Sequence, residues 1–284
     1  MEIIESVFDL ANRFMEDPDY VSINEDGIKE TVSKMLKDGP MPFTEKKTYT
    51  DFEKHYIILE QLTGGAINYC YWYGTSNIRP LDCSSSKMFK VVEDSAKQYL
   101  IQDFHSFFSK IKRELAKQRF PLLEERIKHI NEIQDNHYHF VTPLIKKEKS
   151  FNELFTMMIE LFPGYASDMF LKRASLFFMM LYRIFGWYEE ELHQIHIPAD
   201  YQVPKMLNYF GCLDYSPELK EAITSNQLFP KGSQAECEIR SASIIACQKL
   251  CQKTGWNAAE VDGWFWLKRK ECNFPFHLTV TTDY

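Results

Sequence analysis

The stretch Ile197-Pro-Ala-Asp-Tyr-Gln-Val-Pro-Lys-Met-Leu-Asn-Tyr-Phe-Gly-Cys-Leu-Asp-Tyr-Ser216 contains the signals on which the interpretation of this chain depends. It predicts a helix that starts just after Asp200, and Ser216 before Pro217 predicts the start of a second helix. In the simplest interpretation Asp200 caps the first helix, because its carboxylate accepts hydrogen bonds from the next backbone N–H groups. The same carboxylate, held beside aromatic residues, could instead activate water or stabilise a cation. The pattern leaves both interpretations open.

Most of the chain outside this stretch also has the apolar spacing of helices. Apolar residues between Ile3 and Phe14 line one face of an expected helix. Further helical segments are predicted at residues 27–36, 86–117 and 122–137. Residues 276–281 alternate between polar and apolar and favour a β-strand. The sequence therefore predicts a mainly α fold, a single domain over residues 1–284 with a small β element.

Three later helices carry a start signal in which Ser or Asn is followed three residues later by Glu. In such a capping box the two residues satisfy each other's backbone N–H groups. The pairs are Ser150 with Glu153, Ser233 with Glu236, and Asn257 with Glu260. Between a helix from about 150 and one over about 167–185, Phe162-Pro-Gly-Tyr165 predicts a tight turn.

Composition limits the classes of function. The 284 residues include 33 Lys and Arg against 40 Asp and Glu, and a net charge of −7 disfavours a protein that coats nucleic acid. The longest apolar run, Ala174–Tyr182, is far shorter than the roughly 20 residues that cross a bilayer, and residues 1–5 lack the pattern of a signal peptide. Seven cysteines without a Cys-x-x-Cys pair favour free thiols in a reducing cytoplasm.

Two groups of charged residues have ordinary explanations in the pattern itself. Glu236 and Arg240 have the spacing of an ion pair on one helix face. Lys172 and Arg173 are typical of solvated charges at a helix start. Spacing alone therefore favours structural roles for these residues.

His193, His196 and Asp200 offer a metal-dependent alternative. Spaced at i, i+3 and i+7, two imidazoles and a carboxylate would share one face of a helix and could hold a metal ion. Pro198 disfavours a continuous helix through this span, because its ring clashes with the preceding turn. A helical metal-dependent enzyme that uses these residues is kept as an alternative.

Six segments, in the same order along the chain, resemble the queuosine salvage protein family, whose members are queuosine 5′-phosphate N-glycosylases. Residues 197–216 are similar to the family's Ala-Asp-Tyr-Arg-x-Pro, apolar helix and Gly-x-Leu-x-Tyr-Ser turn, and residues 236–240 to its Glu-x-Glu-Ile-Arg. The other matches are Asn68-Tyr-Cys-Tyr-Trp72, Pro121-Leu-Leu-Glu-Glu-Arg126, Lys172-Arg-Ala174 and Pro275-Phe-His277. Gln202 replaces the family's common basic residue, so no phosphate contact is assigned to it. The first fifty residues match poorly, and no active role is assigned to them.

The resemblance implies an architecture related to helix–hairpin–helix DNA glycosylases and a hydrolase that acts on an N-glycosidic bond. The bond joins C1′ of ribose to N9 of a 7-deazaguanine base. Asp200 is the implied catalytic residue, which stabilises an oxocarbenium-like sugar and activates the attacking water. Neither a cofactor nor a metal is expected.

The resemblance also implies a set of substrate-binding residues. Tyr71 and Trp72 are expected to stack on the base, and Asn68 to bind its polar edge. Glu236 or Glu238 would face the cationic amine of the base's side arm. The 5′-phosphate would be bound by Lys172, Arg173, His196 or His277, with Lys172 preferred to Arg173. Tyr201 and Arg240 complete the expected set.

The expected function is therefore cytoplasmic release of queuine from queuosine 5′-monophosphate, for salvage into tRNA modification. The expected partners are this small substrate and its product, with no intact nucleic acid and no membrane. A non-catalytic protein that binds queuine or a related deazaguanine is the alternative from a different class.

Overall fold

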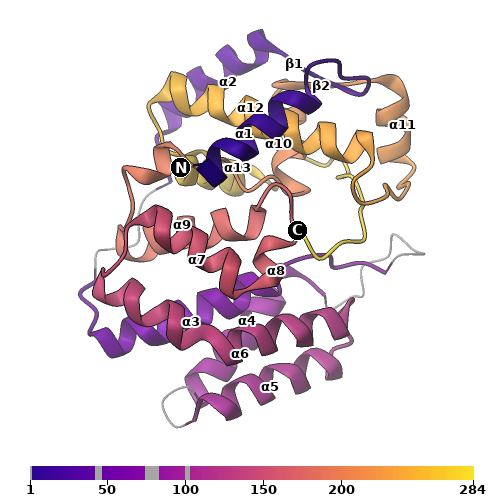
Figure 1. Cartoon of the computed structure of the whole chain (residues 1–284). Coiled ribbons are helices and arrows are strands. Elements are labelled where there is room, and N and C mark those ends of the chain that lie inside the picture. Colours follow the sequence, from indigo (N-terminus) through magenta and orange to yellow (C-terminus); the bar gives the residue numbers. More distant parts are fainter. Residues whose placement is uncertain (1, 42–46, 74–82, 100–102) are drawn as a thin grey trace. The chain divides into compact units, whose positions relative to one another are not determined.

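The computed structural model of the chain describes residues 2–41, 47–73, 83–99 and 103–284, most of which lie in helices (Figure 1). The chain divides into two compact units. Unit 1 is built from residues 1–46 and 178–280, and unit 2 from residues 47–177 and 281–284. The mainly helical fold with a small sheet confirms the predicted fold class. The single domain over residues 1–284 stays a prediction.

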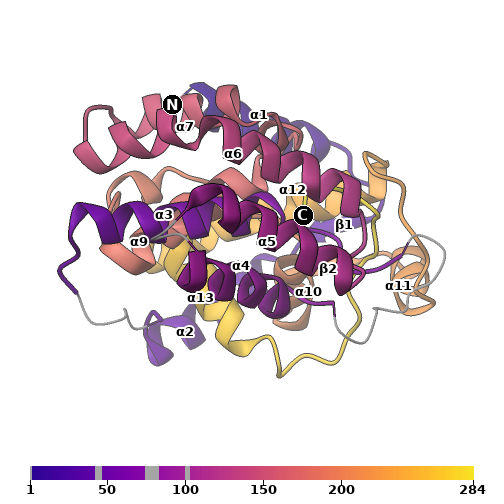
Figure 2. The same ribbon diagram turned by 90° about the horizontal axis from the view of Figure 1, so that it is seen from below.

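Unit 2 is a group of helices packed around the longest helix of the described chain, α6. Helix α6 packs against α3, α5 and α7, and α4 packs against α3 and α5 (Figure 1, Figure 2). Aromatic and aliphatic side chains such as Phe107, Ile133 and Phe140 fill the space between these helices and are fully buried. The helices are α3 (Asp51–Ala66), α4 (Ser85–Tyr99), α5 (Phe104–Lys117), α6 (Leu123–Lys146), α7 (Phe151–Leu161) and α8 (Pro163–Ala166).

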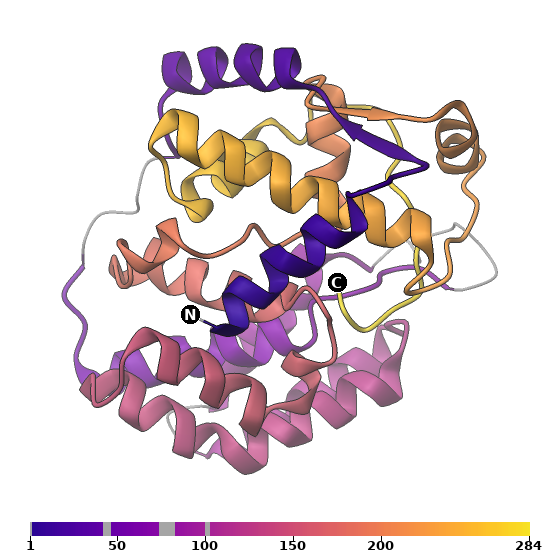
Figure 3. The same ribbon diagram turned by 45° about the horizontal axis from the view of Figure 1, so that its top comes forward.

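Unit 1 is arranged around α12, which contacts α1, α2, α10, α13 and the sheet. Figure 3 shows α1, in indigo, crossing α12, in gold. Strand β1 pairs antiparallel with β2, with Ser22 opposite Asp214. The elements are α1 (Glu2–Phe14), β1 (Val21–Ile23), α2 (Glu25–Asp38), η1 (Glu191–His193), α10 (Gln202–Tyr209), β2 (Leu213–Tyr215), α11 (Pro217–Thr224), α12 (Gln234–Thr254) and α13 (Ala258–Lys268). Helix α9 (Lys172–Phe185) contributes residues to both units.

Several predicted boundaries need correction. The helical pattern over 86–117 corresponds to two helices, α4 and α5, and residues 100–102 lie outside the described residues. The strand predicted at 276–281 is wrong, because Leu278 forms only one isolated bridge, with Leu228, and has no partner strand. The predicted tight turn at Phe162–Tyr165 is instead the one-turn helix α8, and α9 begins at Lys172 rather than near 167.

Two of the three predicted capping boxes are confirmed. Ser150 with Glu153 and Asn257 with Glu260 each show the reciprocal side-chain bonds. The box predicted at Ser233 is wrong, since the Ser233 side chain forms no cap hydrogen bond. Glu236, the other residue of this predicted box, is buried and accepts a hydrogen bond from Gly232 N (2.9 Å). It also forms an ion pair with Arg240, one turn further along α12.

None of the helices in the described part of the chain has the length and apolar character needed to cross a membrane.

Gly27, in the first turn of α2, packs directly on the backbone of Gly211. A Cβ atom at position 27 would lie 1.8 Å from the Gly211 carbonyl oxygen, and neither backbone can move without disturbing its own element. We expect Gly27→Ala to lower the free energy of unfolding by about 3 kcal/mol or more, at the upper end of overpacking effects. Urea unfolding followed by circular dichroism would measure this. Glu30→Ala, at an exposed position of the same helix, should change stability by less than about 0.5 kcal/mol. Equal effects of the two substitutions would contradict the close backbone packing.

Candidate active site

Asp200 is half-buried in unit 1, immediately before α10. Its Oδ1 accepts hydrogen bonds from the backbone N–H groups of Gln202 (2.7 Å) and Val203 (3.2 Å). These bonds satisfy two of the four N–H groups that a helix start leaves without an intrahelical partner. The carboxylate therefore accepts the hydrogen bonds that the capping interpretation expected, although the N-cap residue itself is Tyr201, and these bonds fix the direction of the carboxylate.

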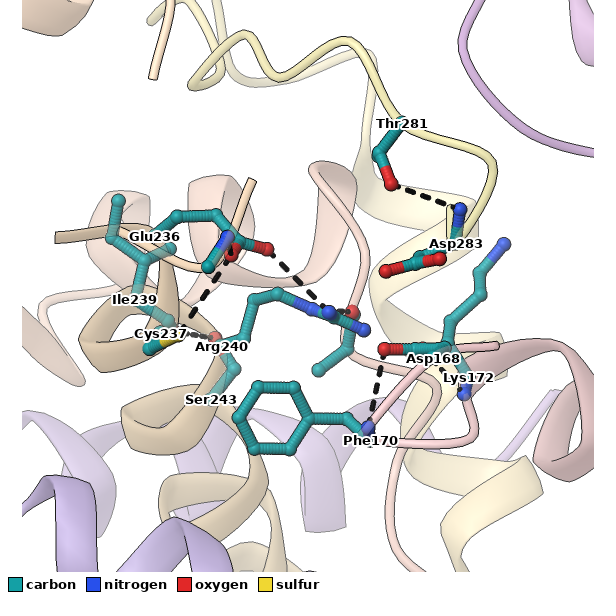
Figure 4. Close-up of polar contacts among 12 residues, drawn as sticks. Asp168, Phe170, Lys172, Glu236, Cys237, Ile239, Arg240, Ser243, Thr281 and Asp283 are labelled. Atoms are coloured by element: carbon teal, nitrogen blue, oxygen red, sulfur yellow. Dashed lines mark hydrogen bonds and ion pairs between the residues drawn. The ribbon is translucent and has the colours of Figure 1, made fainter. Parts of the chain in front are cut away.

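Arg240 of α12 binds the backbone of Ala199, the residue before Asp200. Its Nε donates to the Ala199 carbonyl oxygen (2.9 Å), and its guanidinium pairs with Glu236 Oε1 at 3.4 Å. Figure 4 shows the Glu236 and Arg240 side chains directed toward one another from successive turns of α12. The predicted pair exists, and both side chains are almost fully buried. They are buried because α12 is surrounded by the other elements of unit 1.

Glu238 is engaged by the segment between α1 and β1. Its carboxylate accepts hydrogen bonds from three consecutive backbone N–H groups, of Asp19 (3.1 Å), Tyr20 (2.7 Å) and Val21 (3.2 Å). Its side chain is 1% exposed. This arrangement gives Glu238 a structural task, and its role toward a substrate amine stays a prediction.

An aromatic pair lies next to Asp200 in unit 1. The rings of Tyr201 and Phe276 are 4.6 Å apart between centroids and inclined by 40°. Tyr201 is in the predicted binding set, whereas sequence reasoning missed Phe276. The matched segment Pro275-Phe-His277 could have identified it, because Phe276 is the middle residue of that segment. The fold of unit 1 thus brings Phe276 against Tyr201, the residue that follows Asp200 in the sequence.

Two buried histidines of unit 1 belong to the predicted set. Burial, with a contribution from the positive charge of Arg240, lowers the pKa of His277 to about 3. His277 is therefore neutral at pH 7 and could serve a phosphate only as a neutral hydrogen-bond donor. His196 is 1% exposed, and its Nδ1 lies 3.1 Å from the Ile197 carbonyl oxygen.

The predicted metal-ligand face does not form. The short helix η1 ends at His193 and α10 begins at Gln202, so His193, His196 and Asp200 do not share a helix. This agrees with the expected effect of Pro198. Among the described residues, no group of three His, Cys, Asp or Glu side chains is arranged to hold a metal ion.

In unit 2, the segment after α3 carries Asn68, Tyr71 and Trp72. The Tyr71 hydroxyl donates to Asn68 Oδ1 (2.7 Å), so these two predicted residues are in contact. Tyr71 and Trp72 are each only 1% exposed, whereas Asn68 is half-buried. Stacking of either ring on a ligand stays a prediction.

Arg126 of α6 fixes this segment. It is fully buried and donates to the carbonyl oxygens of Tyr69 (2.6 Å), Cys70 (2.7 Å) and Ile67 and, through Nε, of Pro121 (2.8 Å). These carbonyls lie outside any helical hydrogen-bond ladder and need donors when buried. The matched segment Pro121–Arg126 therefore positions the segment that bears Asn68 and Tyr71.

Arg173 has a similar structural task. Its guanidinium donates to the carbonyl oxygens of Ala66 and Gly164 and to Ser167 Oγ (3.3 Å), so it joins the end of α3 to α8. It is 1% exposed, and burial lowers its pKa. The expectation of a solvated charge at this helix start is therefore wrong, and phosphate binding by Arg173 stays a prediction.

Lys172 is also buried, with 2% of its surface exposed. Its backbone N–H donates to Asp168 Oδ2 (2.9 Å), and Figure 4 shows its side chain extending toward Asp283. Asp168 and Asp283 are almost fully buried as well, and Asp283 Oδ1 accepts a hydrogen bond from Ser167 Oγ (3.3 Å). Lys172 thus belongs to a buried charge cluster and not to a solvated helix start.

A mainly helical chain that holds a half-buried carboxylate beside aromatic rings has the kind of site at which enzymes act on small, flat substrates. A model of the family described as queuosine salvage protein matches residues 55–282. Because this match covers well over half of the chain, the chain belongs to the queuosine salvage protein family.

Curated relatives similar to this chain carry the name queuosine 5′-phosphate N-glycosylase/hydrolase. The protein of Dictyostelium discoideum is 24% identical over 283 residues, covering 84% of this chain and 81% of that protein. The Schizosaccharomyces pombe protein is 28% identical over 54% of this chain and 50% of its own length. The Nematostella vectensis protein is 33% identical over 46% of this chain and 42% of its own length. The last two matches therefore span about half of each relative or less.

The buried pair of Glu236 and Arg240 predicts a strongly asymmetric response to substitution. Arg240→Met leaves the Glu236 carboxylate buried without its cation and should lower the free energy of unfolding by about 3–5 kcal/mol. Glu236→Gln together with Arg240→Met removes both charges, so the double variant should be more stable than Arg240→Met alone. Urea unfolding of the full set of variants measures the coupling. If the double variant lost as much free energy of unfolding as the two single variants together, the two side chains would not be coupled, and the proposed ion pair would be refuted.

His277 predicts a pH dependence of stability. Its pKa is about 3 in the folded chain against an ordinary value of 6.5, so folding favours the neutral ring. This contribution is fully present above about pH 6.5 and is lost as the pH falls toward 3. His277→Gln should therefore reduce the slope of unfolding free energy against pH between pH 6 and about 4, measured by urea unfolding. His139→Gln, at an exposed histidine, is the control and should leave the slope unchanged.

Proposed function

We propose that this chain hydrolyses the N-glycosidic bond of queuosine 5′-monophosphate and releases queuine for salvage into tRNA modification. Membership of the queuosine salvage protein family and the activity named for its relatives support this proposal. One structural observation carries it. The Asp200 carboxylate accepts hydrogen bonds from the N–H groups of Gln202 and Val203, and Arg240 fixes the backbone of Ala199, the residue before it.

Asp200 is the proposed catalytic residue. The bond between C1′ and N9 breaks as its electron pair leaves with the base, and the sugar takes on oxocarbenium character. Water adds its oxygen to C1′, Asp200 accepts a proton from that water, and the base is finally protonated. The base has carbon in place of N7 and so cannot be protonated there before departure, which increases the demand for stabilisation of the sugar cation. A positioned general base contributes roughly 10²–10⁴ in rate.

The binding residues fall into two proposed groups. The side chains of Arg173, Glu238 and Arg240 bind backbone groups that lie far away in the sequence, and we propose that they support the site. The remaining residues keep the roles expected from the sequence. The aromatic rings and the Asn68 amide would contact the base, and the charged or imidazole side chains would bind the phosphate and the amine of the substrate. This second group is Asn68, Tyr71, Trp72, Lys172, His196, Tyr201, Glu236 and His277.

We infer that the hairpin formed by α7, α8 and α9 corresponds to that of helix–hairpin–helix DNA glycosylases. Pro163 and Gly164 begin α8 between the two longer helices. A Cβ atom at Gly164 would lie 2.6 Å from His129 Cδ2, and Gly164 N donates to Glu132 Oε2 (2.8 Å), so a glycine is needed where α8 meets α6. This close approach supports the correspondence.

The proposed substrate is a small molecule, and the proposed location is the cytoplasm. All seven cysteines are free thiols, as a reducing compartment requires. The net charge of −7 supports a released nucleotide rather than intact tRNA as the ligand. A membrane is not part of the proposed environment.

Asp200→Asn tests the catalytic assignment. The amide oxygen of Asn can still accept the two N–H groups of α10, so the fold and substrate binding should be retained. Release of queuine from queuosine 5′-monophosphate, measured by mass spectrometry without added metal, should fall by about 10²–10⁴. Asp214→Asn makes the same change at an exposed carboxylate of β2 and should retain full activity. Normal turnover by the Asp200 variant would refute the assignment.

The same preparations separate the other functional classes. A protein that only sequesters deazaguanine bases would bind queuine tightly and show no turnover with wild-type sequence. A metal-dependent enzyme would retain stoichiometric zinc, iron or manganese through dialysis, as elemental analysis would detect. Turnover by a metal-free preparation supports the proposed hydrolysis over both.

A further inference from the structure

Unit 1 contains a second candidate site, a cavity of about 300 Å³. It is lined by Phe8 of α1, residues 193–197, the C-terminal half of α12 and the Gly255–Trp256 segment. Of the proposed binding residues only His196 lines it among the described residues, whereas Asp200, Tyr201 and Arg240 do not, so the cavity shares one residue with the candidate active site and excludes its catalytic group. Its volume is at the lower end of the range of roughly 300–1,000 Å³ for small-molecule sites.

Among the described residues, the lining of this cavity carries two histidines, His193 and His196, and no Lys, Arg, Asp or Glu. A charged ligand would lose its hydration on entry without gaining a permanently charged counter-ion, which is costly. The lining has no carboxylate for the cationic amine of the proposed substrate, so the cavity does not suit that molecule as a whole. The lining therefore favours an uncharged ligand.

Besides the two histidines and the cysteines Cys247 and Cys251, two kinds of side chain line the cavity. Phe8, Ile195, Ile244 and Trp256 supply apolar and aromatic walls, and aromatic faces favour a planar ligand. The side-chain amides of Gln194, Gln248 and Gln252 each offer a donor and an acceptor.

Gln248 and Gln252 are one turn apart on α12, so their amides occupy the same face of that helix. Paired amide donors and acceptors match the polar edge of a purine, as amide side chains do when they bind adenine. We propose that this cavity binds an uncharged, purine-like heterocycle. Because the prediction concerns binding, it does not depend on the proposed hydrolase activity.

Isothermal titration calorimetry of the full chain with adenine tests the proposal. We expect one adenine per chain with a Kd of about 1 mM or tighter, as suits a ligand of this size. Gln252 is exposed, so Gln252→Trp should fold normally while its indole obstructs the cavity, and adenine binding should weaken at least tenfold. Lys253→Trp places the same side chain at the next exposed position, outside the lining, and should leave binding unchanged.

Two further titrations distinguish this cavity from the candidate active site. Asp200→Asn should bind adenine as the unsubstituted chain does, and adenosine 5′-monophosphate should bind the cavity at least tenfold more weakly because of its phosphate. The proposal is overturned if adenine does not bind at millimolar concentration. It is also overturned if Asp200→Asn abolishes binding while Gln252→Trp preserves it, which would place adenine in the active site. Failure of the hydrolase assay would leave each of these results intact.

Discussion

Buried guanidinium groups that donate to backbone carbonyls hold the irregular segments of this protein in place. Arg126 and Arg173 do so in unit 2, where they bind the carbonyls at the end of α3 and in the segment after it. Arg240 does so in unit 1 at Ala199. A guanidinium has five N–H donors in a fixed plane, so one side chain can satisfy several carbonyls that no helix satisfies. The candidate site residues Asn68 and Asp200 stand on segments fixed in this way.

Buried carboxylates perform the complementary task for backbone N–H groups. Glu238 binds three of them in succession, Asp168 binds those of Phe170 and Lys172, and Asp200 binds two at the start of α10. Removal of such a carboxylate leaves buried N–H groups without partners, which costs more than the net gain of one hydrogen bond. Segments without regular structure can therefore keep defined positions, which a site built on them requires.

The same contacts divide the predicted site residues by task. Asp200 has a fixed direction and precedes Tyr201, whose ring packs against Phe276, so it remains the proposed catalytic group. Arg173, Glu238 and Arg240 lie in the matched motifs and bind backbone groups, and a motif match by itself does not separate residues that hold the fold from residues that bind a substrate.

Local sequence patterns alone predicted the fold class, the starts of several helices and the family resemblance. The helical periodicity, the helix-start hydrogen bonds of Ser150, Asn257 and Asp200, and the family resemblance each depend on residues close in sequence or on short motifs. The environment of Glu236, Arg240 and Lys172 was decided only by the tertiary structure. Spacing along a helix gives the face of a side chain, but burial depends on which distant elements cover that face. The partner strands β1 and β2, and Phe276 beside Tyr201, likewise came from contacts between segments far apart in the chain, which no local pattern encodes.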